Sequence, residues 1–253
     1  MSDQRIAIGG TDGEPAVLST GHRVMLPLST HATITGAVFS ASKAAVASLL
    51  PNALKPIRAT PGRAAITFLC VEYDRIGYDT AIDPYNEFGV LLPAIPEDKQ
   101  TVPYASLLTH GVSGYVEYLP VTTEPARALG VDIWGYPKEV AEITHRDEGS
   151  VRHTSVRVDG ERLIDIAIDR PPQLPWRQSG VSYTEKNGTV LRERLELDGR
   201  LGMWPYSDRV DYVFGEHPRA QALSTLDLGD RALLRFTADA EFWIHEGEAI
   251  GPV

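Results

Sequence analysis

Polar and apolar residues alternate along much of the second half of the chain. Thr154, Val156 and Val158 are separated by polar residues, and a period of two is typical of a strand with one buried face. Asp159-Gly160 follows directly and precedes another apolar stretch, and Asn187-Gly188 separates a second pair of such stretches. Because these dipeptides favour two-residue hairpin turns, the pattern predicts antiparallel β structure.

Apolar runs rich in β-branched residues, bounded by turn residues, predict further strands in the first half. The expected strands cover residues 31–39, 64–73, 87–92, 104–119 (with a bulge or turn at its glycines), 143–148, 150–159, 161–169, 183–185, 189–197 and 233–243.

Three short helices are expected between the strands. The first follows Ser40 or Ser42, the second covers residues 124–130 with Gly130 as its stop, and the third covers residues 218–223, as capping preferences indicate. The sum is a β-rich α+β fold. Residues 1–21 are expected to form an irregular N-terminal segment, and residues 22–253 a single domain, because no internal repeat or linker interrupts them.

Composition narrows the classes of partner. The formal net charge of -10 argues against nucleic acid, which needs a basic surface. No apolar run is long enough to span a membrane, so no membrane partner and a cytoplasmic location are expected. Cys70 is the single cysteine and lies in an apolar run, where a buried thiol is expected. No zinc-type spacing or phosphate-binding glycine loop occurs, so neither a metal nor a cofactor is expected.

Lys138 differs from the other four lysines because large apolar residues surround it. Its neighbours include Trp134, Tyr136 and Pro137. Such surroundings partly desolvate an amine and favour its neutral form, which can attack a carbonyl and form a Schiff base. Pro137 makes the segment before the lysine stiff and extended. The alternative is a lysine whose stem covers apolar surface while its amine reaches water.

Two motifs resemble the acetoacetate decarboxylase family. WGYPKEVAEI, at residues 134–143, is similar to the family's lysine signature, and YNEFGVLLP, at residues 85–93, is similar to the segment that holds its active-site glutamate. The resemblance covers about residues 20–245 and implies a closed, cone-like barrel of antiparallel sheets with few peripheral helices. It further implies a homo-oligomer in which Lys138 is the Schiff-base lysine and Glu87 exchanges protons with the adduct.

The chain also departs from the family pattern. Glu139 stands where typical members carry a second lysine, and a carboxylate in the pocket would favour the charged form of Lys138. Since adjacent strand residues point to opposite faces, Glu139 could instead lie outside it. The family's substrate-side arginine falls near His31, and Arg23 is the nearest arginine before it, so the candidates for binding the substrate at this place are His31 and Arg23. Glu72 is a loose match to a second family glutamate.

Aromatic residues are candidates for the wall of a substrate pocket. Trp134, Tyr136 and Tyr115 are the main ones, with Trp204 and Tyr206 as further candidates. The alternative is that they are ordinary aromatic residues of a β core.

The resulting hypothesis is a Schiff-base lyase that acts on a small oxo acid. The lysine imine would lead either to decarboxylation of a β-keto acid or to pyruvate-type aldol condensation and dehydration. The alternatives are a non-catalytic barrel that binds an apolar or aromatic small molecule, and a purely structural subunit.

Overall fold

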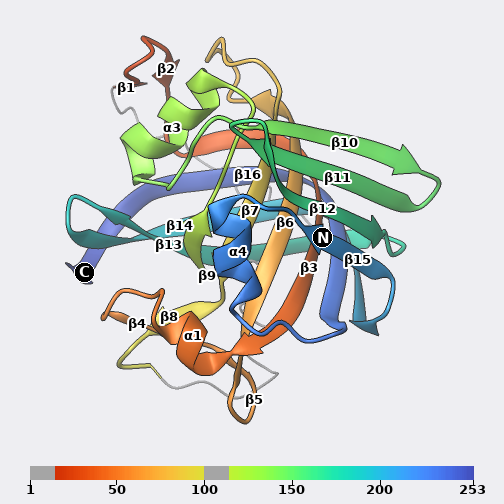
Figure 1. Ribbon diagram of the computed structural model, residues 1–253. Helices are drawn as coiled ribbons and strands as arrows, with labels where there is room; N and C mark the ends of the chain where they lie inside the picture. Colours follow the sequence, from red (N-terminus) through yellow and green to blue (C-terminus); the bar gives the residue numbers. More distant parts are fainter. Residues whose placement is uncertain (1–14, 100–113) are drawn as a thin grey trace, which may run out of the picture.

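Seven strands of the computed structural model, which describes residues 15–99 and 114–253, close into a barrel (Figure 1). Each strand pairs with the next, and the last pairs back with the first. The β9–β13 pair is parallel and the other neighbours are antiparallel. The order around the barrel is β3 (Leu28–Ser42), β16 (Ala232–Pro252), β14 (Thr189–Ser207), β13 (Leu174–Lys186), β9 (Gly114–Tyr118), β7 (Tyr85–Leu92) and β6 (Arg63–Ile76).

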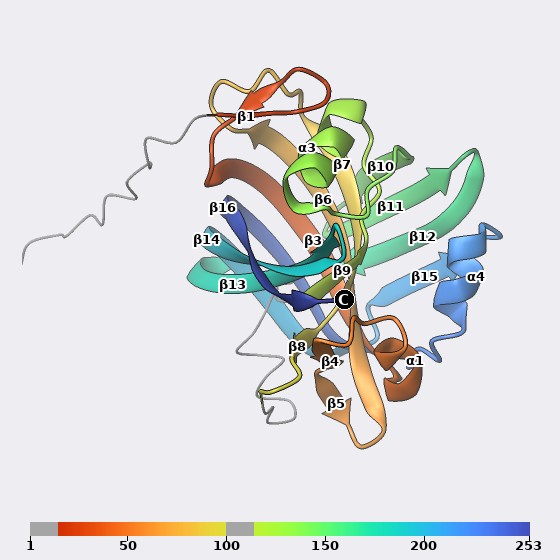
Figure 2. The same ribbon diagram turned by 90° about the vertical axis from the view of Figure 1, so that its left-hand side faces the viewer.

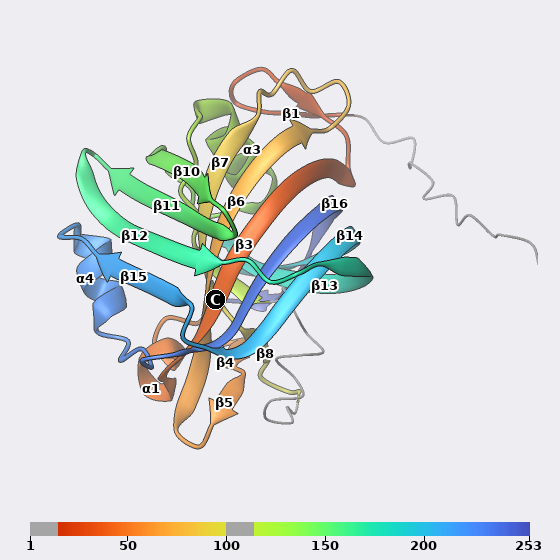
Figure 3. The ribbon, with the colours of Figure 1, turned by 90° about the vertical axis from the view of Figure 1, so that its right-hand side faces the viewer.

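A second, four-stranded sheet lies outside the barrel, across β3, β6 and β7 (Figure 3). A large apolar core fills the space between the two sheets, with Phe39, Phe68 and Phe88 fully buried in it. The sheet order is β10 (Glu142–Glu148), β11 (Val151–Val158), β12 (Glu161–Asp169) and β15 (Val210–Phe214). Two helices, α1 (Lys43–Ala47) and α4 (Pro218–Ser224), contribute Val46 and Leu223 to the same core.

Alternation along β7 separates the outer core from the barrel interior. Phe88 and Val90 face the four-stranded sheet, whereas Leu91 packs in a cluster with Ile34 and Leu197 inside the barrel. Because side chains alternate between the two faces of a strand, Glu87 shares the inward face with Leu91. The interior is therefore the face on which a strand carboxylate can be withheld from water.

One end of the barrel is closed by the helix α3 (Glu124–Trp134) and by a small hairpin of β1 (Ala16–Val17) and β2 (Arg23–Val24) (Figure 2). The opposite end carries α1, β5 (Arg58–Thr60) and the pair β4 (Leu54–Pro56) and β8 (Ala94–Pro96).

The β-rich fold class with a closed barrel and short helices is confirmed. Both predicted hairpin turns are also present, since Asp159-Gly160 and Asn187-Gly188 have the positive φ angles that such turns require. The helix after residue 42 is confirmed, with Ser42 as its N-cap.

Three expectations need correction or lie beyond the described residues. The end of the segment expected to be irregular contains β1, whose apolar neighbour Leu18 packs under α3. The helix expected to stop at Gly130 continues to Trp134, because its left-handed terminating residue is Gly135. The strand expected over 104–119 is described only from residue 114 onward, as β9.

Candidate active site

Lys138 and Glu87 form a buried pair inside the barrel. The Lys138 Nζ donates to Glu87 Oε2 at 2.7 Å, and the two side chains are only 3% and 5% exposed. The rings of Tyr85 and Tyr136 lie beside the amine, with centroids 5.4 and 6.0 Å from Nζ. The lysine is therefore enclosed by aromatic rings and one carboxylate, and it does not reach bulk water.

The backbone around Pro137 explains why Lys138 points inward. After α3 ends at Gly135, whose φ is 72°, the Lys138 N–H bonds to the Tyr136 carbonyl at 2.7 Å. This i to i+2 bond makes a γ-turn centred on Pro137, whose ring fixes the φ angle that the turn needs. The following segment then pairs with Val121, which also bridges Glu87. One residue thus sets the lysine and the glutamate side by side.

Gly130 provides the space that the lysine stem occupies. A Cβ at Gly130 would lie 2.5 Å from Lys138 Cε and 2.6 Å from Cδ, closer than real contacts allow. Glycine in a helix interior costs roughly 1 kcal/mol relative to alanine. In return, the helix surface at Gly130 leaves room for the Lys138 stem to pack against it. Gly130 therefore makes space for the lysine and does not end the helix, which continues to Trp134.

Tyr73 contacts the second oxygen of Glu87, and Tyr85 packs behind Tyr73. The Tyr73 hydroxyl donates to Glu87 Oε1 at 3.5 Å, while Lys138 takes Oε2. The Tyr73 ring stacks on Tyr85 at 4.7 Å. Burial, reinforced by the negative charge of Glu87, raises the pKa of both tyrosines well above 10. Both phenols therefore stay protonated and can donate hydrogen bonds within the site.

Glu139 lies outside the lysine site. Its Oε1 accepts a hydrogen bond from the Tyr118 hydroxyl and lies 3.4 Å from Arg219 Nε, and its side chain is 38% exposed. These contacts are on the side of Tyr118, which faces the outer core. The alternative in which Glu139 points away from Lys138 is therefore the observed one.

Three of the expected substrate-binding residues are not beside Lys138. His31 lies between Asp74 and Asp239, at 2.8 and 3.1 Å, on the outward face of β3. Arg23 is exposed on the β1–β2 hairpin. Tyr115 packs against outer apolar clusters, including the residues around β4 and β8. The side chains of a strand alternate between its two faces, and the local sequence does not show which face lies inside the barrel. The positions of His31 and Tyr115 could therefore not be predicted.

The other two expected residues belong to the site or support it. Tyr136 is beside the amine, and Trp134 stacks behind it at 5.5 Å. The Trp134 Nε1 donates to the His245 carbonyl at 2.8 Å, which anchors the indole in the core below α3.

Trp204 and Tyr206 are exposed and border a different hollow, next to Asp169 and Arg235.

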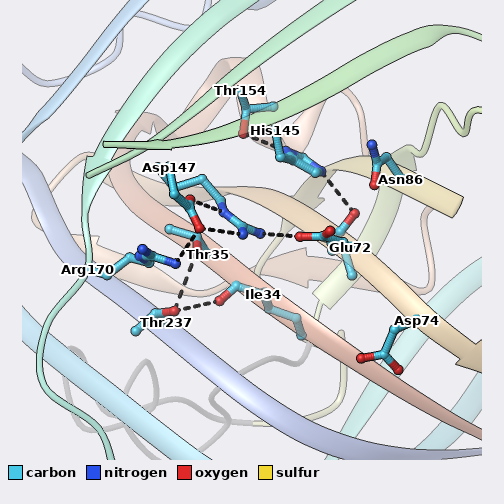
Figure 4. Close-up of polar contacts among 12 residues, drawn as sticks. Ile34, Thr35, Glu72, Asp74, Asn86, His145, Asp147, Thr154, Arg170 and Thr237 are labelled. Atoms are coloured by element: carbon cyan, nitrogen blue, oxygen red, sulfur yellow. Dashed lines mark hydrogen bonds and ion pairs between the residues drawn. The ribbon is translucent and has the colours of Figure 1, made fainter. Parts of the chain in front are cut away.

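Glu72 faces the four-stranded sheet rather than the barrel interior (Figure 4). Its Oε2 lies 3.1 Å from Arg152 Nη1, and Arg152 also pairs with Asp147 at 2.9 Å. Arg170 reaches the same aspartate at 3.0 Å. Hydrogen bonding from Arg152 lowers the pKa of Asp147. This network joins the outer sheet to the barrel, so Glu72 has a structural environment and not one beside Lys138.

A second interior carboxyl was not singled out from the sequence. Glu193 on β14 is 0% exposed, and its Oε2 accepts from the Ser182 hydroxyl at 2.9 Å. Ser182 Oγ lies 3.4 Å from the Tyr136 hydroxyl. Glu193 Oε1 has no hydrogen-bond partner, and burial raises the pKa of Glu193 from 4.5 to about 8. Since Glu193 lies in the charged run RERLEL, no sequence signal marked it as buried.

Three further features of residues 15–99 and 114–253 concern metal ligands, the thiol and membrane spans. No cluster of three or more histidine, cysteine or acidic side chains there could hold a metal ion. Burial raises the pKa of the Cys70 thiol to about 12, which leaves it unreactive. No helix in this part of the chain is long and apolar enough to cross a membrane.

The buried Glu193 makes stability depend on pH. Between pH 4.5 and about 8 the folded protein keeps the Glu193 proton that the unfolded chain has lost, so the free energy of unfolding falls as pH rises. The slope from one such group is at most about 1.4 kcal/mol per pH unit. Urea unfolding over this range should show that Glu193→Gln removes this part of the slope. Glu185→Gln, at an exposed position on the neighbouring strand, should leave it intact, and equal slopes in all three proteins would contradict the expectation.

Comparisons with solved structures show the same fold. An acetoacetate decarboxylase is similar with a TM-score of 0.64 and 13% identity, over 89% of this chain and 90% of that one. The acetoacetate decarboxylase of Legionella pneumophila subsp. pneumophila str. Philadelphia 1 has a TM-score of 0.64 and 11% identity, over 89% and 88%. The enduracididine biosynthesis enzyme MppR, complexed with the condensation product of pyruvate and imidazole 4-carboxaldehyde, has a TM-score of 0.62 and 13% identity, over 96% and 99%.

Sequence comparison supplies the family. A search of curated proteins found no significant match. The family model of acetoacetate decarboxylase (ADC) matches residues 15–180, which is well over half of the chain and includes both Glu87 and Lys138. The protein therefore belongs to the acetoacetate decarboxylase family.

Proposed function

We propose that the protein is a lysine Schiff-base lyase that acts on a small oxo acid. The observation that carries this proposal is the buried contact of 2.7 Å between Lys138 Nζ and Glu87 Oε2. A carboxylate at this distance can take a proton from an ammonium group and return it. The pair can therefore supply the neutral amine that attack on a carbonyl requires.

The reaction would begin with proton transfer from Lys138 to Glu87. The free amine adds to the ketone carbon, and the resulting carbinolamine loses water to give an imine that is protonated on nitrogen. The cationic imine accepts the electron pair of a bond on the carbon next to the imine carbon. If that bond joins a carboxylate, carbon dioxide leaves and an enamine forms; if it joins a hydrogen, a base removes the proton and the same type of enamine forms. Protonation of the enamine, or its attack on an aldehyde, completes the two alternatives.

The side chains described around Lys138 bear on the choice between these reactions. Tyr73, Tyr85 and Tyr136 carry no positive charge, so their hydroxyls would supply hydrogen bonds rather than a cation to the carboxylate of an oxo acid. MppR, which has the same fold, is known in complex with pyruvate and with a pyruvate–aldehyde condensation product. These MppR complexes favour testing pyruvate and aldehydes beside acetoacetate. A homo-oligomer and a cytoplasmic location stay predictions.

Borohydride trapping tests the proposed nucleophile directly. Incubation with pyruvate or acetoacetate and reduction should give a covalent adduct, which peptide mass analysis should locate at Lys138. Lys138→Ala should abolish the adduct, whereas Lys99→Ala, which removes an exposed lysine, should not change it. Absence of any adduct in the wild type over a panel of oxo acids would instead favour a non-catalytic binding barrel.

Replacing Glu87 tests its role in proton transfer. Glu87→Gln keeps the size of the side chain but cannot accept the lysine proton, so the rate of adduct formation should fall by about 100-fold or more. Glu72→Gln is the matched control, since Glu72 lies on the neighbouring strand and faces the outer sheet. Equal rates in the two variants would refute the role of Glu87.

Gly130→Ala tests the space beneath the lysine. The added methyl group would displace the Lys138 stem, because it would lie 2.5 Å from Cε, while alanine should favour the helix itself. We expect a folded protein, with an unchanged circular dichroism spectrum, that forms adduct at least about tenfold more slowly, as a misplacement near 1 Å can cause. Val131→Ala, one residue further along α3, should retain the wild-type rate. A wild-type rate in Gly130→Ala would show that the contact is not needed.

A further inference from the structure

A chain of three polar side chains runs from the lysine site into the barrel wall. It begins at Tyr136, whose ring centroid is 6.0 Å from Lys138 Nζ, continues to Ser182 on β13, and ends at Glu193 on β14. All three side chains are buried. Neither the Lys138–Glu87 pair nor the proposed chemistry uses this chain.

We propose that Glu193 is a positioning residue of the lysine site, which acts through Ser182 to fix the Tyr136 hydroxyl and to receive a proton from it. The inference rests on the proposed function, because it concerns a step of the same Schiff-base reaction. It adds a second proton-accepting group, on a different strand from Glu87.

When Glu193 is ionised, the direction of the hydrogen bonds follows from this acceptor at the end of the chain. Ser182 Oγ donates to Glu193 Oε2 at 2.9 Å, so its lone pairs are free to accept from the Tyr136 hydroxyl at 3.4 Å. The Tyr136 oxygen then has its own lone pairs available. It can accept a proton from a substrate carbon while its hydroxyl proton passes to Ser182 and the serine proton passes to Glu193 Oε2. One proton thus moves from the substrate carbon to the Glu193 carboxylate, with Tyr136 and Ser182 each giving up one O–H proton and gaining another. The electron pair of the broken C–H bond forms the C=C bond of the enamine, and the imine π pair moves onto the Lys138 nitrogen.

The surroundings of Glu193 keep this carboxyl able to titrate near neutral pH. Burial is the main cause of its pKa of about 8. Facing groups come from β13, as Ser182 and the buried Tyr183, and from Tyr136 after α3. On the other side β16 presents Gly247, which carries no charge. No described cation is paired with Glu193, and its Oε1 has no hydrogen-bond partner, so no ion pair counteracts the rise of its pKa that burial causes.

The step most sensitive to such a chain is enamine formation from a bound imine. Removing a proton from the methyl group of a pyruvate imine needs a base, whereas forming the imine depends on Lys138 and Glu87. Loss of Glu193 should therefore slow the first process and spare the second. A merely structural role for Glu193 would affect both processes together.

Exchange of the pyruvate methyl hydrogens in heavy water, followed by proton NMR, measures enamine formation, and borohydride trapping measures imine formation in the same samples. In the wild type the exchange rate should rise with pH through an apparent pKa near 8. Glu193→Gln and Ser182→Ala should each lower exchange by about tenfold or more and abolish this rise. Trapping at Lys138 should stay within about twofold of the wild type.

Glu185→Gln, at an exposed position on β13, is the control and should leave both rates and the pH profile unchanged. A wild-type protein that traps pyruvate but shows the same exchange profile as Glu193→Gln and Ser182→Ala would overturn the inference alone. Equal losses of trapping and exchange would also overturn it, because they would indicate a structural role. If the wild type forms no adduct at Lys138, the proposed function fails and the inference fails with it.

Discussion

The contact between the Lys138 amine and the Glu87 carboxylate is the interaction on which the site depends. Moving two ionisable groups out of water is costly, and their attraction offsets that cost only when the geometry is good and the remaining polar atoms are satisfied. At this pair both oxygens of Glu87 have a donor, since Oε1 accepts from Tyr73 while Oε2 accepts from Lys138 at 2.7 Å. The aromatic rings of Tyr85 and Tyr136 exclude water from the amine.

Barrel closure makes this burial possible. The return pairing of β6 with β3 leaves no open edge in the ring of seven strands, and α3 with the N-terminal hairpin covers the end near the lysine. The four-stranded sheet covers the outer face of the same strands and buries their other side. Strands β6 and β7 are therefore apolar on both faces, so a carboxylate among their inward residues has few ways to reach solvent.

The direction in which neighbouring side chains point explains where the residues that depart from the family pattern lie. Glu139 directly follows the lysine, yet it pairs with Tyr118 and Arg219 outside the barrel. Glu72 lies one residue from inward-facing Val71 and Tyr73, yet it pairs with Arg152 of the outer sheet. Glu139 and Glu72 are thus each next in sequence to a residue that faces the barrel interior, yet both point away from it. The interior instead gains Glu193, from a strand about fifty residues further along the chain.

The sequence by itself determined the β-rich class, both two-residue hairpins and the prominence of Lys138. These features depend on local patterns: a period of two, dipeptides that adopt positive φ, and a lysine placed after an aromatic residue and a proline. Glu87 was singled out by the resemblance of its segment to the family and not by such a pattern. Only the tertiary structure decided which face of each strand is inside, because a shift of one residue reverses every side chain. That choice put His31, Tyr115 and Glu72 outside. The tertiary structure also shows why residue 130 is a glycine, because the stem of Lys138 packs against the helix at that position.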